Sequence, residues 1–447
     1  MENPYYTLLT NITRHFVNFP ENNEAREKCH CASTLIRIHN EKLAVNGDIS
    51  FPLKPDIWKK YFQITKGFKV KEEEINALND PQQQDVRNEF INKAQSWSFP
   101  IAKLDIGQER CHLHLQRPAI IRLLIQKVLS DACYGTLRKS DSRLVKLLPL
   151  QEYGLRREDL SFYRAKLMYE TLQKLLSYSR WLIVDKEETL PSEGNSVLKL
   201  NILSVASKVT AECRLNADSS VNIKCGLVTD PATNGKICQL PTQEYIGLRS
   251  NDMCLMALHK YGVRVKQDAR FCALMERLGV AAVTVDLLEV KHTSPVQIIR
   301  NGQGSTKGAS FILYNSARLE TLLRTFEQRI EQGLYEPMPE ISDIDWNLLN
   351  EEEEWQLVFA YLAGFPDLID RCLEQLDRGI CATHLIIRFL NGLVAIFSVY
   401  YRRIRILTEK RDQLMPFVYA RIYLIKAVRE ILNKTLALLD IQPVEFM

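Results

Sequence analysis

The chain has 447 residues, of which 46% are hydrophobic and 25% are charged, and its formal net charge is +4. This balance is typical of a globular protein of about two to four domains with sizeable cores. A positive charge this small does not by itself indicate nucleic-acid binding. The charge is unevenly placed, because residues 401–447 hold nine Lys or Arg and five Asp or Glu, a local excess of 9 − 5 = +4.

The sequence also argues against membrane and secreted proteins. Met1-Glu-Asn-Pro-Tyr5 has neither the basic start nor the apolar segment of a signal peptide. No stretch of about 18 uninterrupted apolar residues is present, so we expect no membrane span and no membrane partner. Eleven cysteines are scattered without framework spacing, which favours reduced thiols in a cytoplasmic protein.

Helical patterns dominate the N-terminal part. Residues 1–20 place their apolar side chains on one side of a helix, and the Lys- and Glu-rich residues 69–93 predict another. Pro118 suits the start of a helix, which residues 119–129 continue without a breaker. A further helix is expected over residues 160–181.

The middle of the chain changes character. Residues 197–205 alternate, and the run Cys213–Leu215, a turn at Asn216–Ser220 and residues 221–228 predict a β-hairpin. Helices are expected over residues 243–261 and 268–278. Residues 280–288 are apolar, β-branched and short, which predicts a buried strand.

The last third has the pattern of a helical bundle. Residues 301–308 are rich in glycine and predict a flexible linker. After them, apolar residues recur at i, i+3, i+4 and i+7 over residues 319–330, 390–404 and 417–438. Amphipathic helices joined by short loops bury such stripes on one another, so we expect a bundle.

Four blocks of this last third resemble a known module. They are similar to the C-terminal signature of the DALR anticodon-binding domain, the all-helical module that ends arginyl-tRNA synthetases; the blocks are residues 308–318, 365–366, 390–407 and 421–447. Two family motifs differ here. The usual leucine-glycine-isoleucine is Leu439-Asp440-Ile441, and the final glutamate-arginine-methionine is Glu445-Phe446-Met447, which puts in doubt any contact made by that arginine in synthetases.

The catalytic motifs of a class I synthetase do not occur in the upstream two-thirds. Such enzymes need a His-x-Gly-His signature and a Lys-Met-Ser-Lys-Ser loop, which stabilise the charge that develops on the ATP phosphates. Cys111-His-Leu-His114 lacks the glycine and has the wrong spacing for the first motif. Arg138-Lys139-Ser140 resembles the second only faintly and lies too early in the chain.

The resemblance therefore implies an α+β chain in three parts. Residues 1–115 are expected to form an N-terminal α+β domain, and residues 116–300 a degenerate class I synthetase-like α/β region. Residues 301–447 are expected to form an all-α DALR-type helical bundle.

As a whole, the chain resembles the DALR anticodon-binding domain-containing proteins, relatives of the synthetase without synthetase activity. This implies a non-catalytic adaptor that binds arginine tRNAs and supports formation of 3-methylcytidine in the anticodon loop by a partner methyltransferase. No catalytic residue, metal or cofactor is expected. Two alternatives stay open, a divergent arginyl-tRNA synthetase and an interaction scaffold that no longer binds RNA.

Tyrosines and arginines near the C-terminus are candidates for RNA contact. Proteins read single-stranded anticodon loops by stacking bases on aromatic or guanidinium planes and by hydrogen-bonding base edges. Residues 400–405 supply both kinds of side chain within two helical turns. The expected tRNA-binding residues are Tyr314, Arg318, Tyr400, Tyr401, Arg402, Arg403, Arg405, Arg421, Lys426 and Arg429, with Tyr419 and Tyr423 beside the last three.

Each candidate also has an ordinary structural explanation. A tyrosine on an apolar helical stripe usually packs in the core with its hydroxyl bonded, which applies to Tyr400 and Tyr401. Arg421 can pair with an acidic neighbour. The acidic run Glu351–Glu354 can be a solvated helix face.

Other candidate sites have weaker patterns. Cys29-His30-Cys31 and Cys111-His-Leu-His114 suggest zinc ligands, but adjacent ligands strain a shared tetrahedron. A nucleophilic triad can be assembled on paper, but nothing fixes its members close together. Residues 302–308 hold glycines and a lysine without the order of a phosphate-binding loop.

Overall fold

The computed structural model describes most of the chain, in two compact units. The described residues are 3–19, 35–62, 68–137, 143–151, 155–184, 197–204, 220–233, 235–261, 269–300 and 308–444. Unit 1 comprises Met1–Tyr134, Arg329–Asp367 and Val399–Val428. Unit 2 comprises Gly135–Gln328, Leu368–Ser398 and Arg429–Met447.

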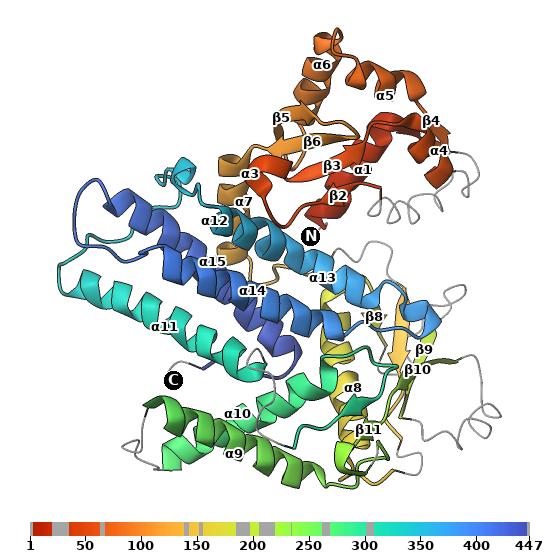
Figure 1. The fold of residues 1–447 in the computed structure, drawn as a ribbon, viewed down its shortest axis with the longest axis vertical. Helices are drawn as coiled ribbons and strands as arrows, with labels where there is room; N and C mark the ends of the chain where they lie inside the picture. Colours follow the sequence, from red (N-terminus) through yellow and green to blue (C-terminus); the bar gives the residue numbers. More distant parts are fainter. Residues whose placement is uncertain are drawn as a thin grey trace. The chain divides into compact units, whose positions relative to one another are not determined.

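The N-terminal part of unit 1 is an antiparallel sheet with helices around it. The four-stranded sheet has the order β2 (Arg37–Ile38), β3 (Ile49–Pro52), β6 (Arg110–Leu115) and β5 (Ile101–Ile106) (Figure 1). A second sheet pairs β1 (Val17–Asn18) with β4 (Lys69–Val70). The helices are α1 (Pro4–Phe16), α3 (Leu43–Asn46), α4 (Pro55–Phe62), α5 (Glu72–Asn79), α6 (Gln84–Ala94) and α7 (Arg117–Ser130).

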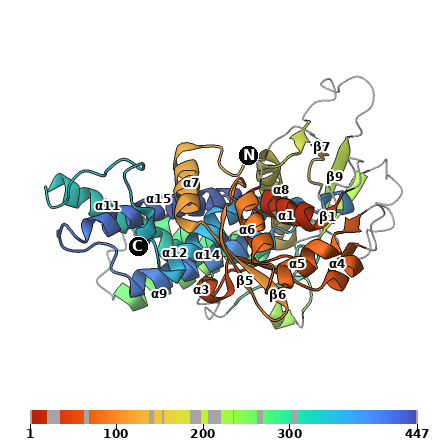
Figure 2. The ribbon, with the colours of Figure 1, turned by 90° about the horizontal axis from the view of Figure 1, so that it is seen from above.

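An aromatic cluster forms the core of this part. Phe16 at the end of α1 lies 5.0 Å from Phe51 of β3 and 5.3 Å from Trp58 of α4, measured between ring centroids. All three side chains are fully buried. Phe90 of α6 joins the cluster, and α6 packs against β5 (Figure 2). Burial of such large apolar surfaces is a main source of stability.

Two of the three predicted helices of this part are confirmed, those of α1 and α7. The single helix predicted over residues 69–93 is wrong. α5 ends at Asn79 and α6 begins at Gln84, because Pro81 lacks the backbone N–H that a helix interior requires.

C-terminal elements complete unit 1. They are a 3-10 turn (Trp346–Leu348), α12 (Glu352–Gln356), a π-helical segment (Leu357–Leu362), the start of α13 (Gly364–Leu373), the last turn of α14 (His384–Arg403) and the larger part of α15 (Met415–Leu438). These elements bring residues far apart in sequence into one compact unit with the N-terminal sheet.

Unit 2 contains a parallel sheet of four strands. The sheet order is β10 (Ser220–Cys225), β9 (Leu198–Ser204), β7 (Leu144–Leu147) and β8 (Leu182–Ile183). β9 and β10 pair in parallel, and β10 covers the second strand of the predicted hairpin. Residues 205–219, which hold the first strand of that hairpin, Cys213–Leu215, and most of its turn, lie outside the described residues, so the hairpin stays a prediction. Alternation with period two does not reveal strand direction.

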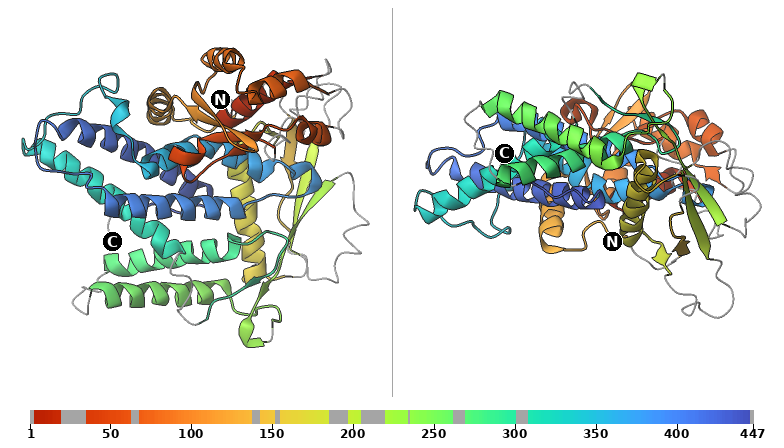
Figure 3. Two further views of the ribbon diagram at one scale, coloured as in Figure 1. Left: turned by 45° about the horizontal axis from the view of Figure 1, so that its top comes forward. Right: turned by 90° about the horizontal axis from the view of Figure 1, so that it is seen from below.

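A pair of long helices corrects a second prediction. α9 (Thr242–Tyr261) and α10 (Ala269–Leu288) lie side by side (Figures 1 and 3). Residues 280–288 continue α10, so the strand predicted there is wrong. A Cβ atom at Gly279 would lie 2.1 Å from Oγ of Ser250, which shows how closely the helices approach. This packing overrides the strand preference of the β-branched residues.

The remaining helix predictions agree with the structure. α8 (Leu160–Tyr178) and α9 match the predicted ranges to within a few residues, and residues after 308 form α11 (Ala309–Glu331), α13, α14 and α15. The fold class is therefore confirmed as a mixed α/β chain with a C-terminal helical region. The domain boundaries at residues 115 and 300 stay predictions, and the linker prediction falls on residues 301–307, outside the described part.

α14 is an apolar helix of 20 residues. Among the described helices it alone is long and apolar enough to cross a membrane by length and composition. Of that apolar window, 44% is buried inside the structure, and a single such helix is weak evidence for a membrane span.

Candidate nucleic-acid interface

α14 ends in a group of exposed cationic and aromatic side chains. One side of the helix is buried in the protein. The buried side chains are Leu390, Leu393, Val394, Phe397 and Tyr400. The last helical hydrogen bond is donated by the N–H of Ile404 to the carbonyl of Tyr400, at 2.8 Å. The chain then runs irregularly until α15 begins at Met415.

Four of the predicted residues have exposed side chains at this end, and one of them, Arg403, binds an acidic residue. Tyr401 is 40% exposed, and Arg402 and Arg405 are exposed. We call these three residues the α14 terminal surface. Cations are favourable at the C-terminus of a helix, where the carbonyl dipoles point outward. The Tyr401 ring and the Arg402 guanidinium on the last helical turn, with the Arg405 guanidinium just after it, are the kinds of group that single-stranded bases stack on.

Tyr400 has a different environment from that predicted for an RNA contact. Its side chain is completely buried, and its hydroxyl donates a hydrogen bond of 2.8 Å to Oε1 of Glu354. Burial, followed by the negative charge of Glu354, raises the pKa of the Tyr400 hydroxyl well above its ordinary value. A buried ring cannot stack on a base, so the assignment of Tyr400 as an RNA contact is corrected.

Glu354 is the centre of a buried polar group. Its Oε1 also accepts from Nε of Arg421 at 3.0 Å, and its Oε2 accepts from the N–H of Glu351 at 3.0 Å. The Glu354 side chain has no exposed area, and that of Arg421 is 13% exposed. We call Tyr400, Glu354 and Arg421 the Glu354 cluster. Arg421 thus forms an ion pair with Glu354, as the structural explanation considered in the sequence analysis expects.

Arg403 also binds an acidic residue. Its guanidinium donates to Glu353 and lies 3.7 Å from Glu351, although the side chain remains 54% exposed. The hydrogen bond to Glu353 raises the pKa of Arg403 above its ordinary value. Glu353 and Glu354 are buried, so the solvated face considered for Glu351–Glu354 is wrong for these two residues.

The tyrosines of α15 pack rather than forming a second open surface. Tyr419 donates its hydroxyl to the carbonyl of Glu336 at 3.2 Å, and Tyr423 donates to the carbonyl of Pro339 at 2.7 Å. Both bonds hold the segment before α12 against α15. Lys426 lies half-buried on the same helix.

The remaining predicted residues belong to unit 2. The guanidinium of Arg318 donates to the hydroxyl of Tyr314 at 2.8 Å and lies 4.6 Å from the centroid of its ring. Arg429 forms an ion pair with Glu320 of α11 at 3.4 Å. These three assignments stay predictions, as do those of Arg402, Arg403, Arg405, Tyr401 and Lys426.

The structure describes one of the two candidate metal sites and not the other. Cys29-His30-Cys31 lies outside the described residues. In β6 the side chain of Cys111 is buried, whereas His112 and His114 point to the opposite face of the strand. Nδ1 of His112 bonds to the carbonyl of Asn46 at 2.7 Å. Within the described ranges no group of three His, Cys, Asp or Glu side chains is placed to hold a metal ion.

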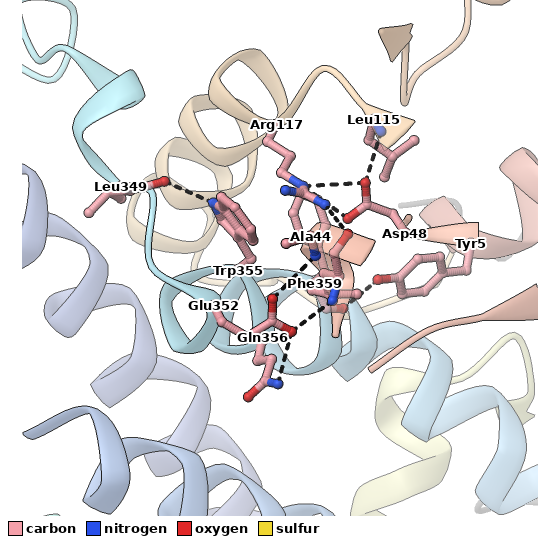
Figure 4. A network of polar contacts seen from close by, with 11 residues as sticks. Tyr5, Ala44, Asp48, Leu115, Arg117, Leu349, Glu352, Trp355, Gln356 and Phe359 are labelled. Carbon is pink, nitrogen blue, oxygen red and sulfur yellow. Dashed lines mark hydrogen bonds and ion pairs between the residues drawn. The ribbon is translucent and has the colours of Figure 1, made fainter. Parts of the chain in front are cut away.

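Sequence reasoning missed the role of the acidic run in joining distant segments. Glu352 accepts from the backbone N–H groups of Leu43, at 2.8 Å, and Ala44, at 3.3 Å (Figure 4). Next to it, the guanidinium of Arg117 lies 3.8 Å from the ring centroid of Trp355 (Figure 4). No local pattern announces these partners, because Glu352 lies more than 300 residues from Leu43.

One departure from the family pattern has a clear geometry. Asp440, which replaces the usual glycine of the family motif, has a φ of +59°. This left-handed conformation favours glycine, but aspartate tolerates it better than most residues. Its carboxylate pairs with Nζ of Lys174 at 2.8 Å. Glu445-Phe446-Met447 lies outside the described residues.

The segments that faintly resemble a synthetase loop or a phosphate-binding loop cannot be assessed. Arg138-Lys139-Ser140 and most of residues 302–308 fall outside the described part. Among the candidate residues that the structure describes, those of the α14 terminal surface, in unit 1, have the exposed tyrosine and arginine side chains that the predicted chemistry requires.

Comparison with known proteins agrees with the sequence pattern. Residues 312–447 match the family described as DALR anticodon binding domain. The chain is 33% identical over 231 residues to DALR anticodon-binding domain-containing protein 3 of Danio rerio, a match that covers 49% of this chain and 40% of the relative. For the protein of the same name from Rattus norvegicus the identity is 32% over 228 residues, covering 50% and 42%. The matches thus span less than half of these relatives.

Arginine–tRNA ligases are also similar. The enzyme of Desulforamulus reducens is 34% identical over 137 residues, which covers 31% of this chain and 22% of the ligase. Among solved structures, arginyl-tRNA synthetases of Thermus thermophilus and Plasmodium falciparum each reach a TM-score of 0.59 at 10% identity. The first likeness covers 92% of this chain and 96% of the other, and the second covers 99% of both.

At 10% identity, the two solved structures show a common fold and nothing finer. The resemblance stated from the sequence is confirmed: the C-terminal helical region, residues 312–447, carries a DALR anticodon-binding domain, on a chain with an arginyl-tRNA synthetase-like fold.

Proposed function

We propose that this chain is a non-catalytic, cytoplasmic tRNA-binding adaptor. It recognises arginine tRNAs and supports formation of 3-methylcytidine in their anticodon loop by a partner methyltransferase. The α14 terminal surface, Tyr401, Arg402 and Arg405, binds the anticodon loop.

The observation that carries this proposal is the exposure of these three side chains within the anticodon-binding domain match. Tyr401 offers a ring for stacking, which contributes about 1–3 kcal/mol per base. Arg402 and Arg405 offer cations for phosphates or planes for bases. The buried stripe of α14 and the Glu354 cluster hold this helix end rigidly, which reduces the entropy lost on binding.

The sequence supports a role without aminoacylation. Neither His-x-Gly-His nor Lys-Met-Ser-Lys-Ser occurs in it. Without the cations of these motifs, the charge that develops on ATP during amino-acid activation lacks its usual stabilisation. The methyltransferase partner and the cytoplasmic location follow from the family resemblance and from the reduced cysteines that we expect.

Binding to purified tRNA tests the first half of the proposal. The full chain is titrated with an arginine tRNA transcript and with an unrelated tRNA at several salt concentrations. We expect tighter binding of the arginine tRNA and a linear loss of log affinity with log salt, because phosphate contacts release counterions. Absence of any salt-dependent binding would instead favour the interaction scaffold.

Mapping of modified bases tests the second half. In cells that lack this chain, 3-methylcytidine should fall in the anticodon loops of arginine tRNAs and persist in other tRNAs. A tagged chain should co-purify with a methyltransferase and with arginine tRNAs. Unchanged modification in these cells would refute the adaptor role while leaving tRNA binding intact.

A divergent arginyl-tRNA synthetase is the second candidate function. The fold likeness and the similarity to ligases named for arginine favour it. An arginine-dependent ATP–pyrophosphate exchange assay decides between the two. Turnover above the blank would establish the enzyme and end the adaptor proposal.

A further inference from the structure

The start of α12 binds to three separate parts of unit 1. Glu352 holds the backbone N–H groups of Leu43 and Ala44 in the N-terminal part (Figure 4). Glu353 binds Arg403 at the end of α14. Glu354 binds both Tyr400 of α14 and Arg421 of α15. One helical turn therefore connects the last turn of α14 to the rest of the unit.

Glu354 is the innermost of these residues. Its carboxylate has no exposed area and accepts three hydrogen bonds, from the Tyr400 hydroxyl, Nε of Arg421 and the N–H of Glu351. A buried carboxylate is stable only when such donors and a countercharge surround it. The donors are in turn fixed in place by it.

The position of Tyr400 determines the direction of its neighbours. Successive residues of an α-helix are turned by about 100° around the axis. With the Tyr400 ring buried and its hydroxyl held at 2.8 Å from Glu354, the last turn of α14 cannot rotate. Tyr401 and Arg402 are then directed away from the buried side, where they are exposed.

We propose that Glu354 is a positioning residue for RNA recognition by the α14 terminal surface. It touches no RNA itself, and it acts through Tyr400 by fixing the rotation of the helix end that carries Tyr401. This inference rests on the proposed function, because it assigns a support to the same binding surface.

A purely structural role would have a different signature. If Glu354 only stabilised the fold, its loss would lower the folded fraction, and this would reduce affinity independently of Tyr401. A positioning role makes the two residues depend on each other. When Tyr401 is removed, Glu354 has no side chain to position. The losses of binding free energy in the two single variants therefore do not add in the double variant.

A double-mutant cycle in the full chain separates these cases. The variants are Glu354→Gln, Tyr401→Ala and their combination, and the probe is an unmodified arginine tRNA transcript in filter binding. We expect each single variant to lose about tenfold in affinity, and the double variant to lose about the same tenfold. Losses that multiply to about a hundredfold would overturn the positioning role.

Two further variants control the cycle. Glu352→Gln alters a neighbouring glutamate that bonds to Leu43 and Ala44 and not to α14, so we expect it to bind as wild type. Tyr400→Phe removes only the hydroxyl and keeps the ring. It replaces Glu354→Gln in the cycle, with the same expectation, if circular dichroism shows that Glu354→Gln is unfolded at the binding temperature.

The outcomes distinguish this inference from the proposed function. If Tyr401→Ala and Arg402→Ala weaken binding while Glu354→Gln and Tyr400→Phe bind as wild type, the positioning role is wrong and the proposed surface stands. If Tyr401→Ala and Arg402→Ala bind as wild type, the surface is wrong and the positioning role is overturned with it.

Discussion

Tyr400 and Tyr401 are neighbours on the last turn of α14, yet they belong to different regions. Tyr400 lies in the Glu354 cluster with no exposed area, whereas Tyr401 is 40% exposed in the α14 terminal surface. The arginines divide in the same way, since Arg421 pairs with buried Glu354 and Arg402 is exposed. Composition alone cannot separate the two regions. Changes in the cluster should cost folding free energy as well as RNA affinity, whereas changes on the surface should cost RNA affinity alone.

The largest expected effect is in the cluster. Arg421→Ala leaves the buried carboxylate of Glu354 without its countercharge, which costs about 3–5 kcal/mol of unfolding free energy. Urea unfolding followed by circular dichroism measures this loss. Arg402→Ala is the matched control and should stay within about 0.5 kcal/mol of wild type. If the two variants had equal unfolding free energies, the cluster would be no more important for stability than the surface.

The next effect is on the surface. Tyr401→Ala should cost about 1–3 kcal/mol of binding free energy for arginine tRNA through lost stacking. Its unfolding free energy should change by no more than about 0.5 kcal/mol. Leu334→Ala removes another exposed apolar side chain of unit 1 and should leave binding unchanged. Filter binding of both variants tests this pair.

A smaller loss of stability is expected for Tyr400→Phe. Removal of one hydrogen bond to Glu354 should cost about 0.5–1.5 kcal/mol of unfolding free energy. Calorimetry or urea unfolding at neutral pH measures it. A variant as stable as wild type would show that the hydroxyl contributes nothing to the cluster.

The same variant has an expected pH dependence. Because the pKa of Tyr400 is raised above the ordinary 10.0, the folded protein keeps this proton at a pH where the unfolded chain loses it. The contribution of the Tyr400 hydroxyl to the unfolding free energy is therefore fully present below pH 10 and decreases as the pH rises further. The difference in unfolding free energy between wild type and Tyr400→Phe should shrink above pH 10.

The smallest effect concerns the salt dependence. Arg402→Ala should weaken all tRNAs alike and reduce the slope of log affinity against log salt by about one, if this side chain contacts one phosphate. Titrations at four salt concentrations give the slope. A change confined to arginine tRNAs would show that Arg402 reads a base instead.

Helices with a clear apolar period could be predicted from the sequence. α7, α8, α9 and α14 were found because their patterns extend over many residues. Strand direction could not be found in this way, because β9 and β10 alternate alike whether they pair in parallel or antiparallel. Residues 280–288 were misassigned because their β-branched side chains are buried by α9, which lies elsewhere in the sequence.

The candidate site was only partly predictable for the same reason. The sequence shows that tyrosines and arginines gather at the end of α14, but not which of them are buried. The burial of Tyr400 depends on Glu354, 46 residues away, and that of Arg421 on the same carboxylate, 67 residues away. A run of four glutamates usually lies in solvent, so its inward-facing members give no local signal.

Site-specific cross-linking tests the central claim most directly. A photoreactive amino acid replaces Tyr401 in the full chain, and the irradiated complex with arginine tRNA is mapped by sequencing. We expect cross-links in the anticodon loop, and none when the same group replaces Val45, which is 78% exposed in the same unit. Cross-links elsewhere on the tRNA, or equal cross-linking from both positions, would contradict recognition of the anticodon loop by the α14 terminal surface.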